Sequence, residues 1–263
     1  RDHVRGGSPF DGGESLVKNQ GYINGLFYDA NAMAPARSKT DLMWSADMIK
    51  VGLAGSIRDY VVKTHWDATL HLEQLDYNGQ PAGYVSSPAE VVNYVENHDN
   101  QTLFDLNALR LPRGTSREER ARVQVLGGAL TAFSQGVAYF HAGLDILRSK
   151  SLDKNSFDSG DAFNRLDWTY RGNHFGAGLP PVEDGGRDDA ILKAALSDAR
   201  IAPGPREIAF ARDAFRDLLR IRASSTLFRL RTAQDVRERL TFFNTSPYQV
   251  PGVITAHVDC QGY

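Results

Sequence analysis

Apolar residues recur at helical spacing in three stretches of the chain. Over residues 40–52 they lie three or four positions apart and end at two glycines, which predicts an amphipathic helix. A second helix is predicted from Ser116, because Ser116 and Glu119 form an S-x-x-E capping box ahead of a single apolar stripe. A third helix is predicted after the Pro203-Gly204-Pro205 turn.

Short runs of β-branched and aromatic residues predict strands between these helices. Those that precede the tail lie at residues 57–62, 91–95 and 137–140. The tail holds two more runs, at 240–243 and 253–258, which predict antiparallel strands of a different, β-rich unit. Residues 63–87 are rich in turn-forming residues and are predicted to be mainly loop.

The alternation of strands and helices indicates an α/β fold with parallel strands joined by crossover helices. A complete (β/α)8 barrel takes about 250 residues, and the predicted strands are too few to close one. We therefore expect a partial (β/α)8 TIM barrel, with about its last three strands and their helices, over residues 1–230. Residues 231–263 are expected to begin a C-terminal β-sandwich domain. The loop-like opening at Arg1, without an initiator Met, favours a piece of a longer protein.

Charge and composition exclude several classes of function. The chain has 30 Lys and Arg against 32 Asp and Glu, a net charge of −2, so it lacks the basic field that nucleic acid requires. Hydrophobic residues make up 41% of the sequence, enough for a packed core, yet no run approaches the roughly 20 apolar residues of a membrane helix. Cys260 is the only cysteine, which excludes an intrachain disulfide.

The strand predicted at residues 91–95 ends in an unusually polar block that contains Asn97, His98 and Asp99. In a parallel α/β barrel the working groups lie where strands end. His98 can donate a hydrogen bond to a hydroxyl, and Asp99 can hold negative charge against a developing cation. The alternative is that Asn97 and Asp99 cap the following turn and that His98 is a rim residue.

A second polar region, residues 156–168, interleaves Asp161, Asn164 and Arg165 with Phe and Trp. This composition is typical of sugar binding, because hydroxyls take planar hydrogen-bonding partners and the apolar face of a pyranose stacks on aromatic rings. The alternative is a surface loop that buries two aromatic side chains.

Other candidate chemistry is weaker. His65, Asp67, His71 and Glu73 lie close together in the sequence, but they lack H-E-x-x-H spacing, so we expect no metal site there. The phosphate-binding loop motif and the G-x-S-x-G nucleophile motif are both missing. Cys260 has no evident base partner and is expected to be inert.

Six sequence blocks run in order along almost the whole chain. They are VRGGSPFD (residues 4–11), NQG (19–21), DYNGQPAGY (76–84), VVNYVENHDNQTL (91–103), LRSKS (147–151) and SGDAFNRLD (159–167). Together they resemble the later part of the pullulanase-type α-1,6-glucosidases, debranching enzymes of the α-amylase superfamily that include the limit dextrinases.

The resemblance implies a retaining glycosidase that cleaves α-1,6 branch linkages in pullulan, starch or limit dextrins. It makes Asp99 the transition-state stabiliser, which favours an oxocarbenium-like distortion of the sugar ring. It assigns His98 to the glucose at the cleavage subsite, with Asn97 also binding substrate. It places the loop from Asp161 to Arg165, which includes Asn164, along the groove for the branched substrate.

The other two catalytic carboxylates of the family have no match in the 263 residues. The G-x-R-x-D block that carries the nucleophile is missing, as is the G-E-G-W segment with the acid/base Glu. A retaining mechanism needs a nucleophile and an acid about 5–5.5 Å apart. We therefore expect the chain by itself to be inactive.

Two residues depart from the family pattern and bear on fine specificity: Ala162 stands where Trp is usual, and Asp145 where Glu is usual. Calcium is common in the superfamily, but the resemblance assigns it to no residue here. The expected partner is an α-glucan. A non-catalytic α-glucan-binding protein and an unrelated His-Asp metal hydrolase are the alternatives. An extracellular or periplasmic compartment is favoured, although the sequence does not set it.

Overall fold

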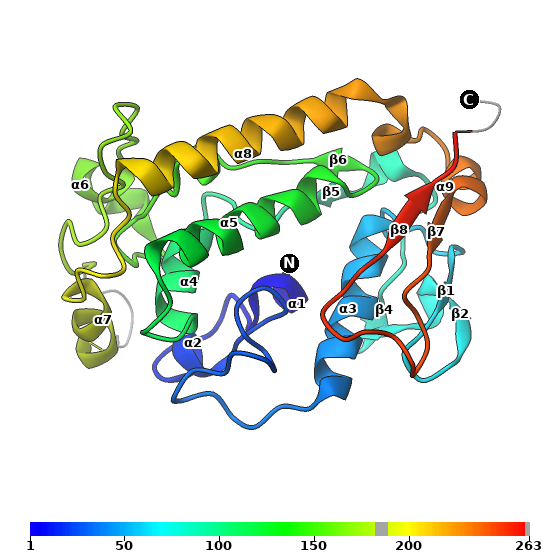
Figure 1. The fold of residues 1–263 in the computed structure, drawn as a ribbon, viewed down its shortest axis with the longest axis horizontal. Helices are drawn as coiled ribbons and strands as arrows, with labels where there is room; N and C mark the ends of the chain where they lie inside the picture. The colour runs from blue at the N-terminus through cyan, green and yellow to red at the C-terminus, as the bar shows by residue number, and fades with distance from the viewer. Residues whose placement is uncertain (182–188, 261–263) are drawn as a thin grey trace. The chain divides into compact units, whose positions relative to one another are not determined.

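The computed structural model describes residues 1–181 and 189–260, which form two compact units (Figure 1). The first unit comprises Arg1–Ala36, Val95–Ala129 and Phe140–Asp217. The second unit comprises Arg37–Tyr94, Leu130–Tyr139 and Leu218–Tyr263. Every strand in the described residues belongs to the second unit. The described part of the first unit therefore consists of helices and loops.

Short helices joined by long connections make up most of the first unit. They are α1 (Asp2–Arg5), α2 (Ser15–Lys18), α4 (Leu103–Arg110), α6 (Asp161–Asn164) and α7 (Asp189–Leu196), with 3-10 turns at Leu144–Ile146 and Ser156–Asp158. Two longer helices, α5 (Arg117–Ala132) and α8 (Pro205–Ser224), begin in this unit and lie side by side (Figure 1). Ala121 of α5 shares one apolar core with Ile208 and Ala211 of α8.

Capping residues fix the starts of the predicted helices. The backbone N–H of Ser116 donates to Glu119 Oε2 at 2.9 Å, and the Ser116 hydroxyl accepts from the backbone N–H of Glu119 at 3.2 Å. The helix predicted over residues 40–52 is α3 (Lys39–Leu53), where Ser38 forms a second capping box with Asp41. The third predicted helix is α8. All three helix predictions are confirmed.

The strands of the second unit form two-stranded pairs. Antiparallel pairs join β1 (Val61–Lys63) to β2 (Thr69–His71), β3 (Asp76–Tyr77) to β4 (Gln80–Pro81), and β7 (Leu240–Phe242) to β8 (Ala256–Val258). A parallel pair joins β5 (Val92–Asn93) to β6 (Val137–Ala138). The unit also holds α9 (Ala233–Arg239) and 3-10 turns at Leu72–Gln74, Pro88–Glu90 and Thr226–Arg229. The parallel pair and the antiparallel tail strands confirm their predictions.

Two predictions for residues 57–87 are wrong. The run at 57–62 is predicted as a barrel strand, but its second half pairs antiparallel in the β1–β2 hairpin, with Val61 opposite His71. The stretch predicted as loop contains β2, β3 and β4. The β3–β4 hairpin forms because Asn78 (φ 53°) and Gly79 (φ 82°) adopt the left-handed backbone of a tight two-residue turn.

The tail packs into the apolar core of the second unit. Val236 and Leu240 belong to the same buried cluster as Val62 and Leu72, and the Tyr60 hydroxyl donates to the Leu240 carbonyl at 2.9 Å. The division into a barrel part (1–230) and a C-terminal β domain (231–263) stays a prediction, and residues 261–263 lie outside the described residues. Within the described ranges, no helix is both long and apolar enough to cross a membrane.

Candidate functional site

The polar block predicted at a strand end directly follows β5 and forms an exposed turn. The side chains of His98 and Asp99 are 79% and 69% exposed, and His98 Nε2 lies 3.6 Å from Asp99 Oδ1. Asn97 Oδ1 accepts from the backbone N–H of Asp99 at 3.0 Å, so the Asn97 side chain caps the turn as the alternative interpretation expects. Asn100 completes the turn with a left-handed backbone (φ 61°).

Asp99 lines a cavity of about 460 Å³ in the first unit. Phe10 lines it too, and its ring is 91% exposed. The other lining residues come from four loop segments and from helices α2 and α7: Pro9, Asp11, Gly12, Gly13, Leu16, Asn100, Gln101, Leu152, Asp153, Lys154, Asn155, Pro180, Pro181 and Leu192. A cavity lined by an exposed carboxylate, an exposed ring and further polar groups suits a sugar better than an apolar ligand.

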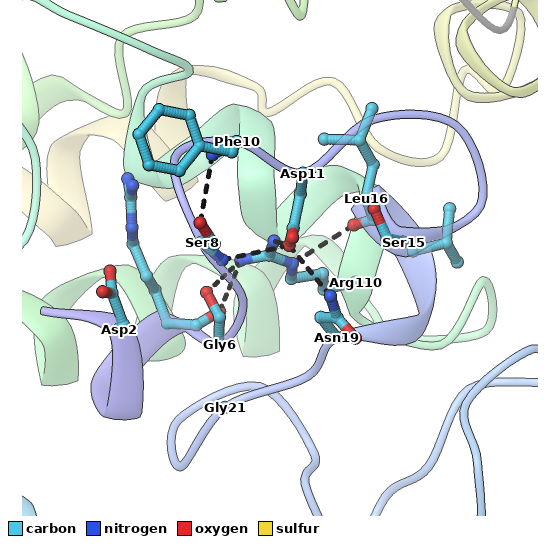
Figure 2. Close-up of polar contacts among 12 residues, drawn as sticks. Asp2, Gly6, Ser8, Phe10, Asp11, Ser15, Leu16, Asn19, Gly21 and Arg110 are labelled. Atoms are coloured by element: carbon cyan, nitrogen blue, oxygen red, sulfur yellow. Dashed lines mark hydrogen bonds and ion pairs between the residues drawn. The ribbon is translucent and has the colours of Figure 1, made fainter. Parts of the chain in front are cut away.

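The buried guanidinium of Arg110, on α4, holds the loop that carries Phe10 (Figure 2). Its Nη1 donates to the carbonyls of Arg5 at 2.8 Å and Gly6 at 2.7 Å. Its Nε donates to the Leu16 carbonyl at 3.2 Å, and its Nη2 to Asp11 Oδ2 at 3.1 Å. One cation therefore fixes both ends and the middle of this loop.

The Asp11 carboxylate also accepts hydrogen bonds from two other residues of this loop region. Its Oδ2 also accepts from the Ser8 backbone N–H at 3.1 Å and from Asn19 Nδ2 at 3.0 Å (Figure 2). Gly6 has a φ of +81°, and a Cβ there would lie 2.1 Å from the Asn19 carbonyl oxygen. Only glycine lets the two halves of the loop approach this closely.

A second buried network lies behind the His98–Asp99 turn. Asp105, on α4, accepts from the Ser149 hydroxyl at 2.5 Å and from the Lys150 backbone N–H at 2.8 Å. Lys150 Nζ donates to the His98 carbonyl at 3.1 Å. Burial raises the pKa of Asp105 to about 6, against the opposing effect of these hydrogen bonds.

A third chain of polar contacts joins the strand end to the predicted sugar-binding loop. Glu96 Oε1 lies 3.2 Å from His141 Nδ1, and His141 Nε2 lies 3.1 Å from Arg148 Nη1. Because a guanidinium can only donate, Nε2 must be the acceptor, and we assign the ring proton to Nδ1, facing Glu96. Arg148 Nη2 then donates to the Asn164 carbonyl at 2.7 Å.

The three residues predicted in that loop lie at and just after α6. The Asn164 side chain bonds inward, to Ser156 and to the Gly160 carbonyl, whereas Asp161 and Arg165 are exposed. None of the three lines the cavity with Asp99, and neither does His98. Asp145, which departs from the family pattern, is partly buried, and burial raises its pKa. Within the described residues, no group of three or more His, Cys, Asp or Glu side chains is arranged to hold a metal ion.

Sequence reasoning missed Phe10, Arg110 and Lys150 as parts of this site. Phe10 and Lys150 stand inside two of the resembling blocks, VRGGSPFD and LRSKS, so those blocks carried a signal. No sequence signal marked Arg110, because its loop partners lie 94 to 105 residues away in the sequence.

Comparisons with known proteins identify the family. Residues 170–262 match the family "Alpha-1,6-glucosidases, pullulanase-type, C-terminal". Over 98% of its length the chain is 42% identical to Pullulanase 1, chloroplastic, of Arabidopsis thaliana, and 37% identical to the pullulanase of Klebsiella aerogenes. The apo pullulanase of Klebsiella pneumoniae matches 98% of the chain with a TM-score of 0.94 and 36% identity. The chain therefore carries the pullulanase-type C-terminal family domain and matches part of known pullulanases over almost its whole length.

Only part of each relative is covered. The chain spans 27% of the Arabidopsis pullulanase, 23% of the Klebsiella aerogenes pullulanase and 28% of the Klebsiella pneumoniae apo structure. It therefore spans about a quarter of the length of the curated relatives that it matches. A maltotriose complex of the Klebsiella pneumoniae enzyme also matches it, with a TM-score of 0.91 and 35% identity.

Replacing Arg110 with Met should lower the free energy of unfolding by about 3 kcal/mol, because three loop carbonyls and the Asp11 carboxylate lose their buried partner. Urea denaturation measures this loss. Arg113→Met, at an exposed arginine of the same unit, is the control and should change stability by less than about 0.5 kcal/mol. Equal effects of the two substitutions would contradict the role given to Arg110.

Asp105 should make stability fall as the pH rises from about 4 to 7. Its folded pKa of about 6 lies above the unfolded value, so its contribution is fully present below the unfolded pKa and is lost through pH 6. Relative to Asp105→Asn, the parent should lose up to roughly 3 kcal/mol of unfolding free energy over this range. Urea denaturation across the range measures the difference, and parallel profiles would refute the prediction.

Proposed function

We propose that this chain is the part of a retaining α-1,6-glucosidase that supplies the transition-state stabiliser and one wall of the sugar site. The substrate class is the branched α-glucans pullulan, starch and limit dextrins. The observation that carries this proposal is that Asp99 and the exposed Phe10 line one cavity and that both lie within sequence blocks shared with the pullulanases. The maltotriose complexes of a structural relative support a sugar ligand.

The proposed barrel assignment makes β5 and β6 neighbouring strands of a partial (β/α)8 barrel, followed by the start of a β-sandwich domain in the tail. Their parallel pairing supports it, as does the polar turn that directly follows β5. Parallel strands in such a barrel end at one face, where loops form the active site. In this assignment the His98–Asp99 turn lies at the catalytic face.

The proposed chemistry follows from charge and hydrogen bonding. Asp99, an exposed carboxylate, accepts hydrogen bonds from ring hydroxyls and stabilises positive charge that develops at the anomeric carbon. His98 donates to a sugar hydroxyl, and the Phe10 ring stacks on the apolar face of a glucose unit.

The loop after α6 takes a secondary part in the proposed groove. Asp161 and Arg165 are both exposed, so their side chains are available to contact the branched glucan outside the cavity. Asn164 contributes indirectly, since its own amide is used to hold the loop together. Asn97 likewise acts by shaping the turn that presents Asp99.

The decisive experiment replaces the matching segment of the Klebsiella pneumoniae pullulanase with this chain, which aligns with it at a TM-score of 0.94. The chimera should hydrolyse pullulan, and Asp99→Asn should lower its kcat by about 100-fold or more, as expected when a transition-state stabiliser is removed. A folded chimera in which Asp99→Asn keeps full turnover would refute the proposed role.

The isolated 263-residue chain is the control for that experiment. It should bind maltotriose but release no reducing ends from pullulan, because the family's nucleophile and acid/base blocks are missing from its sequence. A chimera that binds maltotriose without any turnover would instead favour a non-catalytic α-glucan-binding protein.

Phe10→Ala should weaken maltotriose binding by the isolated chain about five- to tenfold, which corresponds to roughly 1 kcal/mol of lost stacking. Isothermal titration calorimetry measures the dissociation constant. The matched control is Tyr248→Ala, because Tyr248 is similarly exposed, at 94%, but does not line the cavity. Equal loss in both variants, or none in Phe10→Ala, would remove Phe10 from the site.

A further inference from the structure

Lys150 is a buried cation that bonds to the turn it lies behind. Its side chain is 1% exposed, and its Nζ donates to the backbone carbonyl of His98 at 3.1 Å. Burial lowers the pKa of Lys150, while Asp105 and Asp153 oppose that shift electrostatically. Burying an ammonium is costly unless it is well bonded, so this contact needs an explanation beyond the filling of space.

The backbone of Lys150 is held by hydrogen bonds, as its ammonium group is. Asp105 Oδ2 accepts the Lys150 backbone N–H at 2.8 Å, and Asp105 Oδ1 accepts the Ser149 hydroxyl. Asp105 lies in the first turn of α4, where its backbone N–H donates to the capping hydroxyl of Thr102 at 3.1 Å. The line from helix α4 through Lys150 to His98 is therefore continuous and rigid.

Left-handed backbone conformations occur in both segments that this bond joins. Asn100 (φ 61°) follows the His98–Asp99 turn, and Leu147 (φ 59°), Ser151 (φ 52°) and Leu152 (φ 68°) flank Lys150. Left-handed conformations cost residues other than glycine about 1–3 kcal/mol each. They persist only where the surroundings over-determine the backbone, and the bond from Lys150 Nζ to the His98 carbonyl is one contact that joins the two segments.

We propose that Lys150 is a positioning residue for sugar recognition: its ammonium holds the His98 carbonyl so that the turn presents Asp99 to a glucose unit of the α-glucan in the cavity. This inference rests on the proposed function. The bond reaches the peptide between the two residues assigned to the sugar, so its loss frees both side chains together.

The Asn97 contact restrains the turn only locally. Asn97 Oδ1 holds the Asp99 amide from two residues away, which shapes the turn but does not attach it to the rest of the unit. Lys150 supplies a long-range attachment from 52 positions further along the chain. A charge-assisted bond to the carbonyl is also stronger than a neutral one.

The test uses the isolated chain, labelled for NMR, as the parent and as Lys150→Met, Lys150→Arg and Lys193→Met. Lys193 is an exposed lysine of the same unit that does not line the cavity. Without sugar, the Asp99 amide should exchange with solvent about tenfold faster in Lys150→Met, while Lys150→Arg and Lys193→Met stay near the parent. Loss of a charged hydrogen bond of about 1.5 kcal/mol accounts for this factor.

Maltotriose titration supplies the second readout. Lys150→Met should bind about tenfold more weakly than the parent, and Lys150→Arg should restore most of the affinity because it keeps a cationic donor. In the parent, maltotriose should shift the His98 amide and the Lys150 Nζ signals together. This last measurement needs no variant and decides the matter if the substitutions prevent folding.

The outcomes separate this inference from the proposed function. Unchanged Asp99 exchange in a folded Lys150→Met chain overturns the positioning role, whatever the sugar does. Faster exchange with no binding of maltotriose by the parent supports the positioning of the turn but refutes a sugar site. A parent in which maltotriose shifts His98 and leaves Lys150 Nζ unmoved also overturns the inference.

Discussion

Buried cations that bind backbone carbonyls give the first unit its shape. Its described residues contain no strand, so its long connections have no ladder to satisfy their carbonyl groups. Arg110 binds the carbonyls of Arg5, Gly6 and Leu16, and Arg120 binds those of Asn107, Pro112 and Thr115. Each contact satisfies a buried carbonyl and also offsets the desolvation of the cation.

These contacts converge on the cavity from helix α4. Arg110, at its last turn, fixes the loop that carries Phe10, whereas Asp105, at its first turn, fixes the segment that carries Lys150. Two walls of the cavity are therefore both attached to one short helix. This arrangement explains how a site assembled from loops can hold an exposed ring and an exposed carboxylate in a fixed relation.

Much of this organisation was visible in the sequence, but only where local signals are strong. Capping boxes and apolar stripes predicted α3 and α5, and β-branched runs predicted β5 and β6. Helix α4 was missed because all eight of its residues are buried. Its sequence therefore lacks the regular alternation of apolar and polar residues that marks an amphipathic helix. Strands of two or three residues, such as β3 and β4, are also too short to show alternation.

In the candidate site, too, local features were predictable from the sequence and long-range contacts were not. The His98–Asp99 turn was predictable, because an unusually polar block follows a short apolar strand. The inward bonding of Asn164 was not, since it depends on how its loop folds back on Ser156 and Gly160. Lys150 and Arg110 act on residues far away in the chain, and no local pattern encodes such a pairing.

The guanidinium contacts have a consequence for behaviour in acid. Burial lowers the pKa of Arg110 only to about 10, so acidification never removes the proton that its carbonyl bonds require. Three of its four bonds to the Phe10 loop go to backbone carbonyls, which do not titrate. The attachment of this loop to Arg110 therefore depends mainly on groups whose charge does not change in acid.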